Sequence, residues 1–213
     1  MTTAQAQPES GRAFAAPELS DDVQVWIVRH GETEWSRTGR HTGTTDLPLT
    51  EAGKDQARAL RGMLAGVSPA LVLCSPLTRA LETARLAGLS VDEVTPDLAE
   101  WNYGAYEGRT TAEIRRERPG WSLWTDGVPD GESPQQVAER ADRVLRRVAE
   151  SVRKGPVVLV GHGHFSRALG ARWIGLPISG GANLALGTAA PSVLGAQYGA
   201  PLIDRWNLPN PAA

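Results

Sequence analysis

The chain has 213 residues, of which 41% are hydrophobic and 22% charged, and this is the composition of a soluble globular protein with one sizeable core. Its formal net charge of -2 argues against a general nucleic-acid binder, which needs a basic surface. No apolar run approaches the roughly 20 residues of a membrane span. Neither nucleic acid nor a membrane is therefore an expected partner.

The domain organisation is read from composition. Residues 1–21 are rich in Ala, Gln, Pro and Ser and are expected to form a disordered arm. A single domain is expected over residues 22–208, followed by a short tail at residues 209–213. Cys74 is the only cysteine, which excludes an intrachain disulfide and favours a cytoplasmic location.

Two buried strands are predicted in the first half of the chain. They are the apolar, β-branched runs at residues 23–28 and 70–74. Thr50 can cap a helix between them that runs to about Leu64, after a polar loop. The pair Ser75-Pro76 is expected to begin the next helix, because proline is tolerated at the first helical position.

The second half continues the alternation of strands and helices. Two capping-box spacings, Thr110 with Glu113 and Ser133 with Gln136, predict the starts of two helices. Five further strands are expected at residues 91–94, 156–160, 182–186, 193–197 and 202–206, with a helix that follows Gly163 and runs through Ile174. Strands that alternate with helices predict an α/β fold, a three-layer α/β/α sandwich with a mostly parallel central sheet.

Histidines and arginines gather where strands end. Arg29 and His30 follow the first strand, and His162 follows the strand at residues 156–160. Ligands of such sheets bind beyond the carboxyl ends of the strands, and Arg79 lies early in a helix that leaves the same edge. Cationic groups that converge need an anion, and the planar guanidinium fork matches phosphate oxygens. The sequence therefore predicts a phosphate-binding pocket.

Three sequence blocks together resemble the histidine phosphatase superfamily. They are Arg29-His30-Gly31, then Ser75-Pro76 with Arg79, Ala80, Thr83 and Ala84, and finally His162-Gly163. The resemblance covers residues 23–206 and points to the phosphoglycerate mutase-like branch, closest to small broad-specificity acid phosphatases. It implies a single histidine phosphatase domain with the phosphoglycerate mutase-like fold.

The resemblance also implies a role for each residue of these blocks. His30 takes the phosphoryl group as a phosphohistidine, Glu100 protonates the leaving group, and the phosphate oxygens are held by Arg29, Arg79 and His162. Arginines can stabilise a transferring phosphoryl group in place of Mg²⁺, so neither a metal nor a cofactor is expected. Substrate binding is expected from Ser36, Thr42, Gly43, Trp101, Tyr103, Gly163 and His164.

The sequence favours a metal-independent phosphatase that hydrolyses small phosphomonoesters over the other functions compatible with these residues. A phosphoglycerate mutase is the main alternative. The relatives with mutase activity carry a long insertion after the acid, whereas here only about thirty residues separate Glu100 from Gly131-Glu132-Ser133. Ser36 also stands where the mutases usually have asparagine. Both features favour hydrolysis of a small phosphorylated metabolite.

Two less favoured alternatives are a metal site and a non-catalytic module. A metal at His162 and His164 would need a nearby carboxylate or a third histidine, and none adjoins them in the sequence. A non-catalytic phosphate-binding module would be expected to have lost the nucleophile, the acid or an arginine. The natural substrate and a homo-oligomeric state are left open by the sequence.

Overall fold

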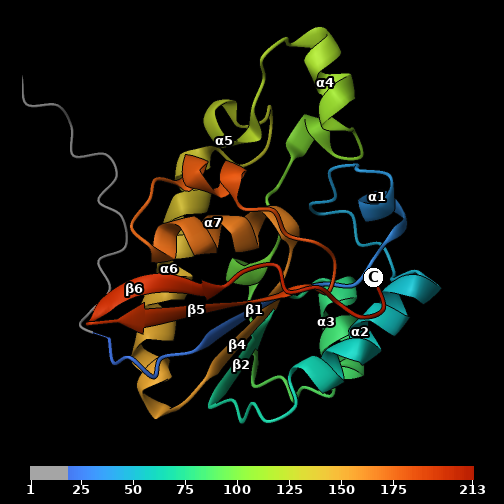
Figure 1. Ribbon diagram of the computed structural model, residues 1–213. Helices are drawn as coiled ribbons and strands as arrows, with labels where there is room; N and C mark the ends of the chain where they lie inside the picture. The colour runs from blue at the N-terminus through green and yellow to red at the C-terminus, as the bar shows by residue number, and fades with distance from the viewer. Residues whose placement is uncertain (1–18) are drawn as a thin grey trace, which may run out of the picture.

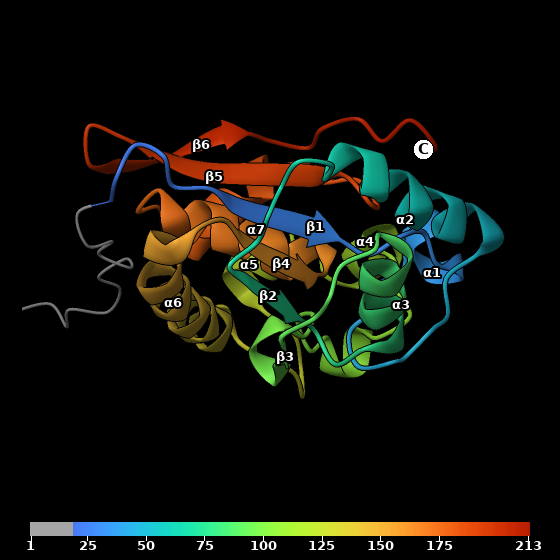
Figure 2. The same ribbon diagram turned by 90° about the horizontal axis from the view of Figure 1, so that it is seen from below.

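The computed structural model describes residues 19–213 and has a six-stranded mixed sheet with helices on both sides (Figures 1 and 2). Most of the predicted arm, residues 1–18, lies outside the described residues. The strands are β1 (Val25–Arg29), β2 (Leu71–Cys74), β3 (Glu93–Val94), β4 (Val157–Gly161), β5 (Pro191–Gln197) and β6 (Ala200–Arg205). Their order is β3-β2-β4-β1-β5-β6, with parallel pairing from β3 to β1 and antiparallel pairing of β5 with β1 and β6.

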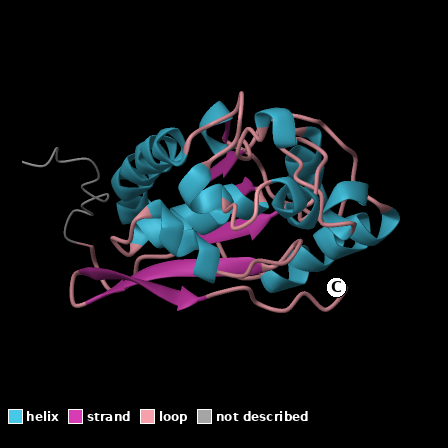
Figure 3. Cartoon of the chain, turned by 90° about the horizontal axis from the view of Figure 1, so that it is seen from above, coloured by secondary structure: helices cyan, strands magenta, loops and turns pink. Residues whose placement is uncertain are grey.

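The helices form the two outer layers around this sheet, as Figure 3 shows in cyan. The α-helices are α1 (Glu34–Arg37), α2 (Glu51–Met63), α3 (Thr78–Leu86), α4 (Thr111–Glu117), α5 (Leu123–Asp126), α6 (Pro134–Ser151) and α7 (Gly163–Trp173). Four 3₁₀ turns are η1 (Pro96–Leu98), η2 (Gly104–Tyr106), η3 (Val152–Lys154) and η4 (Ile178–Asn183). The predicted α/β sandwich is confirmed, and α4 and α5 lie beyond the end of the sheet, at the top of Figure 1.

Alternate side chains of the buried strands point to opposite faces of the sheet. Val25 and Ile27 of β1 belong to the core that faces α6 and α7. Trp26 and Val28 belong to the second core, beneath α2 and α3. Strands buried on both faces read as continuous apolar runs in the sequence, and this is why their positions were predictable.

The predicted capping boxes are present at the N-termini of α4 and α6. The predicted helix start at Ser75-Pro76 is wrong, because α3 begins at Thr78. The backbone N–H of Ser75 still bonds to Val160 of the sheet, and Asp46 accepts from the N–H of Thr78. These hydrogen bonds to the sheet and to Asp46 therefore place the start of the helix at Thr78.

The predicted strand at residues 182–186 is also wrong. This segment is the end of η4 and an irregular loop, and β5 takes the place beside β1 in the sheet. Gly181 lies against the Trp124 ring, where an added Cβ would come within 2.5 Å. Packing against α5 and α7 thus holds this segment away from the sheet.

The chain packs slightly beyond the predicted limits of the domain. Leu19, within the expected arm, is buried in the core. Asn210, within the expected tail, is buried, and its amide donates to the carbonyls of Gln56 and Ala189. Among residues 19–213 there is no helix long and apolar enough to cross a membrane.

Candidate active site

The register of two parallel strands brings the two histidine turns together. Arg29 pairs with Gly161 at the ends of β1 and β4, and the N–H of His30 donates to the Gly161 carbonyl at 2.9 Å. The next residue after each strand is a histidine, and the His30 and His162 rings lie 5.2 Å apart between centroids. The convergence expected at the strand ends is therefore present.

The hydrogen bonding of His30 fixes its tautomer. Its Nδ1 lies 2.7 Å from the carbonyl oxygen of Gly31, an acceptor, so Nδ1 carries the proton and donates. Burial lowers the pKa of His30 well below its ordinary value, and the cationic Arg29 and Arg79 lower it further. The ring is therefore neutral, with the lone pair on Nε2, the atom that a nucleophilic imidazole uses.

His162 is held by two partners behind His30. The Arg79 Nε donates to its Nδ1 at 3.2 Å, which leaves the proton on Nε2, and Nε2 donates to the Ser75 hydroxyl at 2.7 Å. Burial, followed by the charge of Arg79, keeps the pKa of His162 well below its ordinary value. Both ring nitrogens of this neutral histidine thus have protein partners.

Arg79 organises the loop at residues 42–45 that follows α1. Its guanidinium is fully buried and donates to the carbonyls of Thr42, Gly43 and Thr45 at 2.9–3.0 Å. Glu107, which sequence reasoning missed, grips the same loop from the other side. One of its carboxylate oxygens accepts from the N–H groups of Gly43 and Thr45. The loop is therefore fixed by a cation on its carbonyls and an anion on its N–H groups.

Arg29 reaches the pocket with unused donors. Its Nη1 donates to the Leu186 carbonyl at 2.6 Å, while its buried Nε has no partner among residues 19–213. The guanidinium lies against Gly163, where an added Cβ would come within 3.2 Å of Nε. Burial lowers the pKa of Arg29, and the charge of Glu100 opposes that shift. A buried cationic donor of this kind is stabilised by a bound anion.

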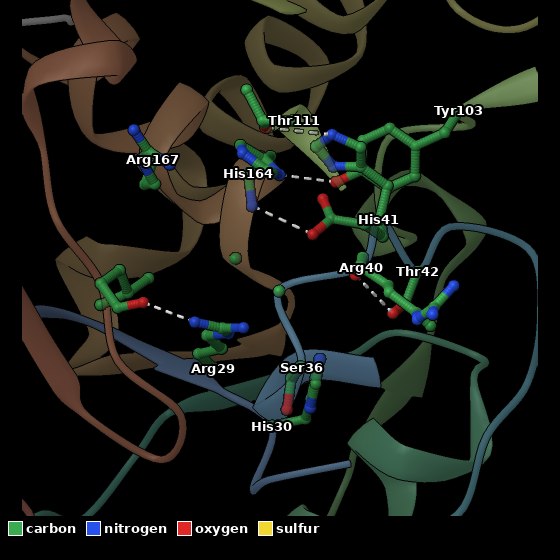
Figure 4. Close-up of a pocket in the computed structure, with 14 residues that line it drawn as sticks. Arg29, His30, Ser36, Arg40, His41, Thr42, Tyr103, Thr111, His164 and Arg167 are labelled. Atoms are coloured by element: carbon green, nitrogen blue, oxygen red, sulfur yellow. Dashed lines mark hydrogen bonds between the residues drawn. The ribbon is translucent and has the colours of Figure 1, made fainter. Parts of the chain in front are cut away.

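A pocket opens between β1 and α7, with Arg29 and His30 at one end and His41, Tyr103 and His164 at the other (Figure 4). It is lined by Arg29, His30, Ser36, Gly39, Arg40, His41, Thr42, Glu100, Tyr103, Thr111, Gly163, His164, Arg167 and Leu186. Ser36 also closes the capping box of α1 with Thr33. The lining combines three arginines with a single carboxylate.

That carboxylate, Glu100, is fixed at the N-terminus of α7. One oxygen accepts from the N–H of His164 at 3.0 Å, and the other accepts from the N–H of Phe165 at 2.8 Å and that of Trp101 at 2.9 Å. The side chain is only 8% exposed and borders the pocket. Helix N-termini offer free N–H donors, which explains why an acidic group settles here.

The far end of the pocket is built from neutral rings. The Tyr103 hydroxyl and the His164 Nδ1 are 2.6 Å apart, and the His41 and Tyr103 rings stack with centroids 4.7 Å apart. Burial lowers the pKa of His41 to about 4 and that of His164 well below its ordinary value. His41, Arg40 and Arg167 line the pocket but were not foreseen, because nothing in their local sequence separates them from surface residues.

Some residues predicted to bind substrate lie outside the pocket lining. Trp101 is buried in the core, where its indole N–H donates to the Glu132 carbonyl, so it is a packing residue here. Gly43 belongs to the loop gripped by Arg79 and Glu107. Gly31 is packed against the protein itself, because an added Cβ there would meet the Gly53 carbonyl of α2 at 2.2 Å.

The two histidines of the last turn do not form a metal cluster. Within residues 19–213, no group of three or more His, Cys, Asp or Glu side chains could hold a metal ion. His162 is bonded to Arg79 and Ser75, and His164 is bonded to Tyr103. The donor set around His30 instead suits an oxyanion.

Several proteins similar to this chain are phosphatases by name, and others are named as probable phosphoglycerate mutases. The chain is 48% identical to the acid phosphatase of Mycobacterium tuberculosis over 83% of this chain and 88% of that protein. It is 36% identical to the sedoheptulose 1,7-bisphosphatase of Saccharomyces cerevisiae, over 71% of this chain and 68% of that protein.

A solved phosphatase structure is also similar to this chain. A mycobacterial glucosyl-3-phosphoglycerate phosphatase in complex with VO3 matches with a TM-score of 0.76 at 32% identity. That match covers 88% of this chain and 100% of that chain. A family model for the histidine phosphatase superfamily (branch 1) matches residues 25–209. This chain therefore belongs to the histidine phosphatase superfamily, branch 1.

Proposed function

We propose that this protein is a metal-independent phosphatase that hydrolyses small phosphomonoesters through a phosphohistidine on His30. The observation that carries the mechanism is the tautomer of His30, whose Nδ1–H is bonded to Gly31. Nε2 is thereby left with a free lone pair, and the same pocket is lined by Arg29, whose Nε–H has no partner among residues 19–213. The names of the relatives support phosphatase activity on small phosphorylated compounds.

In the first half-reaction, the lone pair of His30 Nε2 attacks phosphorus and the ester P–O bond breaks. The alkoxide that leaves takes a proton from Glu100, which borders the same pocket. Arg29 supplies donors to the phosphoryl oxygens, on which negative charge is spread in the transition state. Nδ1 keeps its proton throughout, and its bond to Gly31 holds the ring orientation.

In the second half-reaction, water attacks the phosphorus of the phosphohistidine. Glu100, now ionised, accepts a proton from that water, the P–N bond breaks, and phosphate leaves with His30 restored to its neutral form. The enzyme returns to its starting state with no external oxidant, reductant or metal.

Arg79 and His162 are assigned to the phosphate site as a connected pair. His162 lies 5.2 Å from His30 between ring centroids, and its Nε2–H donates to Ser75. We propose that a bound phosphoryl group takes over this N–H as acceptor, with Arg79 fixing the ring from Nδ1. Ser36, Thr42, Tyr103, Gly163 and His164 line the pocket and are proposed to contact the substrate.

The proposed setting is a cytoplasmic enzyme acting on small phosphorylated metabolites. Hydrolysis is favoured over mutase activity by the short segment between Glu100 and Glu132, which here forms the 3₁₀ turn η2 and the short helices α4 and α5. A mutase assay with 2,3-bisphosphoglycerate tests this choice. Sedimentation velocity tests whether copies of the chain associate.

The test of the mechanism uses p-nitrophenyl phosphate and the variant H30A. Wild type is expected to hydrolyse the substrate at full rate in excess EDTA, and H30A to lose activity while keeping its fold. Brief mixing with ³²P-labelled substrate followed by alkaline quench should trap an acid-labile phosphoenzyme in wild type alone. Turnover by H30A at the wild-type rate, or activity that EDTA abolishes, would overturn the proposal.

A further inference from the structure

A buried arginine outside the pocket holds the chain segment that carries Glu100. Arg140 of α6 is 7% exposed, and its Nη1 donates to the carbonyls of Asp97 at 3.0 Å and Ala99 at 2.6 Å. Its Nη2 donates to the carbonyl of Glu100 itself at 3.3 Å. Three carbonyls within four residues thus point to one guanidinium, which fixes the backbone leading into Glu100.

Glu132 binds both Arg140 and the residues that follow Glu100. It pairs with Arg140 through both carboxylate oxygens, at 2.9 and 2.7 Å. One of these oxygens also accepts from the N–H of Asn102 at 2.9 Å, and the Glu132 carbonyl accepts from the Trp101 indole at 2.8 Å. Arg140 therefore binds the backbone carbonyls that lead up to Glu100, and Glu132 accepts hydrogen bonds from the two residues that follow it.

The same guanidinium touches the second element that holds the Glu100 carboxylate. The Arg140 Cζ lies 4.1 Å from the centroid of the Phe165 ring in α7. The N–H of Phe165 is one of the donors to the Glu100 carboxylate. Arg140 thus fixes both the backbone of Glu100 and the helix end against which its side chain rests.

All five N–H donors of Arg140 point to acceptors, namely Glu132 and the three carbonyls. Only a planar guanidinium can satisfy this set, because lysine has one charged nitrogen and three donors. Such a network stabilises one position of Glu100 and disfavours others.

We propose that Arg140 and Glu132 are positioning residues that set the proton-transfer geometry of Glu100. The inference rests on the proposed role of Glu100 as acid and base. The pair is absent from the pocket lining, and it acts on proton transfer through the placement of Glu100. A displacement of about 1 Å is enough to cost roughly 10²-fold when proton transfer depends on that placement.

The test exploits the dependence of general acid catalysis on the leaving group. p-Nitrophenolate departs without a proton, whereas the alkoxide of glycerol phosphate needs one. The ratio of kcat/KM for the two substrates therefore reports proton donation, because kcat/KM covers the steps up to cleavage of the ester bond. A fall in the amount of correctly folded enzyme lowers both values equally and leaves the ratio unchanged.

The expected results for R140K and E132Q follow from this reasoning. Both variants should lose about 10–10²-fold in kcat/KM with glycerol phosphate, and less than about 3-fold with p-nitrophenyl phosphate. E100Q should show the same pattern with a larger loss, on the order of 10²–10⁴-fold for glycerol phosphate. The double variant E100Q/R140K should lose no more than E100Q alone, since both act on one proton transfer.

A matched control is available in another buried arginine pair. Arg172 of α7 is 4% exposed and donates to both carboxylate oxygens of Asp142 at 2.8 and 2.7 Å. R172K should lower thermal stability to a similar degree as R140K while keeping the wild-type ratio of the two substrates. E132Q provides a milder change should R140K fail to fold.

The outcomes distinguish failure of the positioning role of Arg140 and Glu132 from failure of the proton-transfer role of Glu100. Equal losses with both substrates in R140K and E132Q, alongside a leaving-group-dependent loss in E100Q, would overturn the positioning role of the pair. A loss in E100Q that does not depend on the leaving group would overturn the proton-transfer role of Glu100 and, with it, this inference.

Discussion

The Nε–H of Arg79 donates to Nδ1 of His162 at 3.2 Å, so this ring nitrogen is a hydrogen-bond acceptor and carries no proton. The same guanidinium donates to three carbonyls of the loop at residues 42–45. One side chain therefore links the tautomer of a histidine in the centre of the site to the shape of a loop at its rim.

This linkage predicts a large effect of a charge-conserving change at Arg79. Lysine cannot reach His162 and the loop together, because it lacks the guanidinium fork. We expect R79K to lower kcat/KM for p-nitrophenyl phosphate by at least about 10²-fold. R85K, a change on the exposed side of the same helix, should have little effect. Retention of near wild-type kcat/KM in R79K would contradict the role of the fork.

The pH at which activity is lost on the acid side of the pH–rate profile should lie below the pKa of an ordinary histidine. In the proposed mechanism, protonation of His30 removes the nucleophile, so activity is lost as the pH falls through the pKa of His30 in the folded enzyme. Burial and the nearby Arg29 and Arg79 lower that pKa well below 6.5. His30 should therefore remain neutral at pH 6.5 in an NMR titration of the imidazole, assigned by comparison with H30A. A midpoint at or above 6.5 would refute this prediction.

Stability should also depend on pH through the buried histidines. The folded protein holds His30, His41, His162 and His164 neutral, with pKa values below 6.5, and that of His41 falls to about 4. The unfolded chain binds protons at these histidines below about pH 6.5. The contribution of these neutral histidines to the free energy of unfolding is therefore complete above that pH and is lost as the pH falls.

The slope of this loss can be measured. Urea denaturation between pH 7.5 and 5 should show the free energy of unfolding falling by up to about 1.4 kcal/mol per pH unit for each such histidine. H41Q removes one of them and should make the slope shallower by up to that amount. A free energy of unfolding that rises toward pH 5 would contradict burial of the neutral rings.

The two glycines that follow His30 and His162 should respond differently to alanine. In G31A the added Cβ would meet a backbone carbonyl of α2 at 2.2 Å, so we expect a loss of at least about 2 kcal/mol in stability. In G163A it would meet the Arg29 guanidinium at 3.2 Å, a side chain that can shift.

G163A should accordingly keep most of its stability and lose activity, by about 10-fold or more in kcat/KM, because Arg29 would be displaced from the phosphoryl oxygens. Thermal melts and p-nitrophenyl phosphate kinetics of the two variants distinguish the effects. A stable, active G31A protein would show that the contact with α2 relaxes.

The sequence by itself determined the elements whose signals are local. Buried parallel strands are continuous apolar runs, and capping boxes such as Ser133 with Gln136 mark helix starts within four residues. The placement of His30 and His162 at strand ends was also readable, because parallel strands end at one edge of the sheet.

Only the tertiary structure decided the contacts between distant segments. Glu107 and Arg140 look like surface charges in the sequence, and their roles depend on carbonyls and N–H groups brought to them by other elements. Trp101 and Tyr103 are two positions apart, yet one packs in the core and the other lines the pocket. Such assignments follow from where backbone groups lie in space, and spacing along the chain does not encode that.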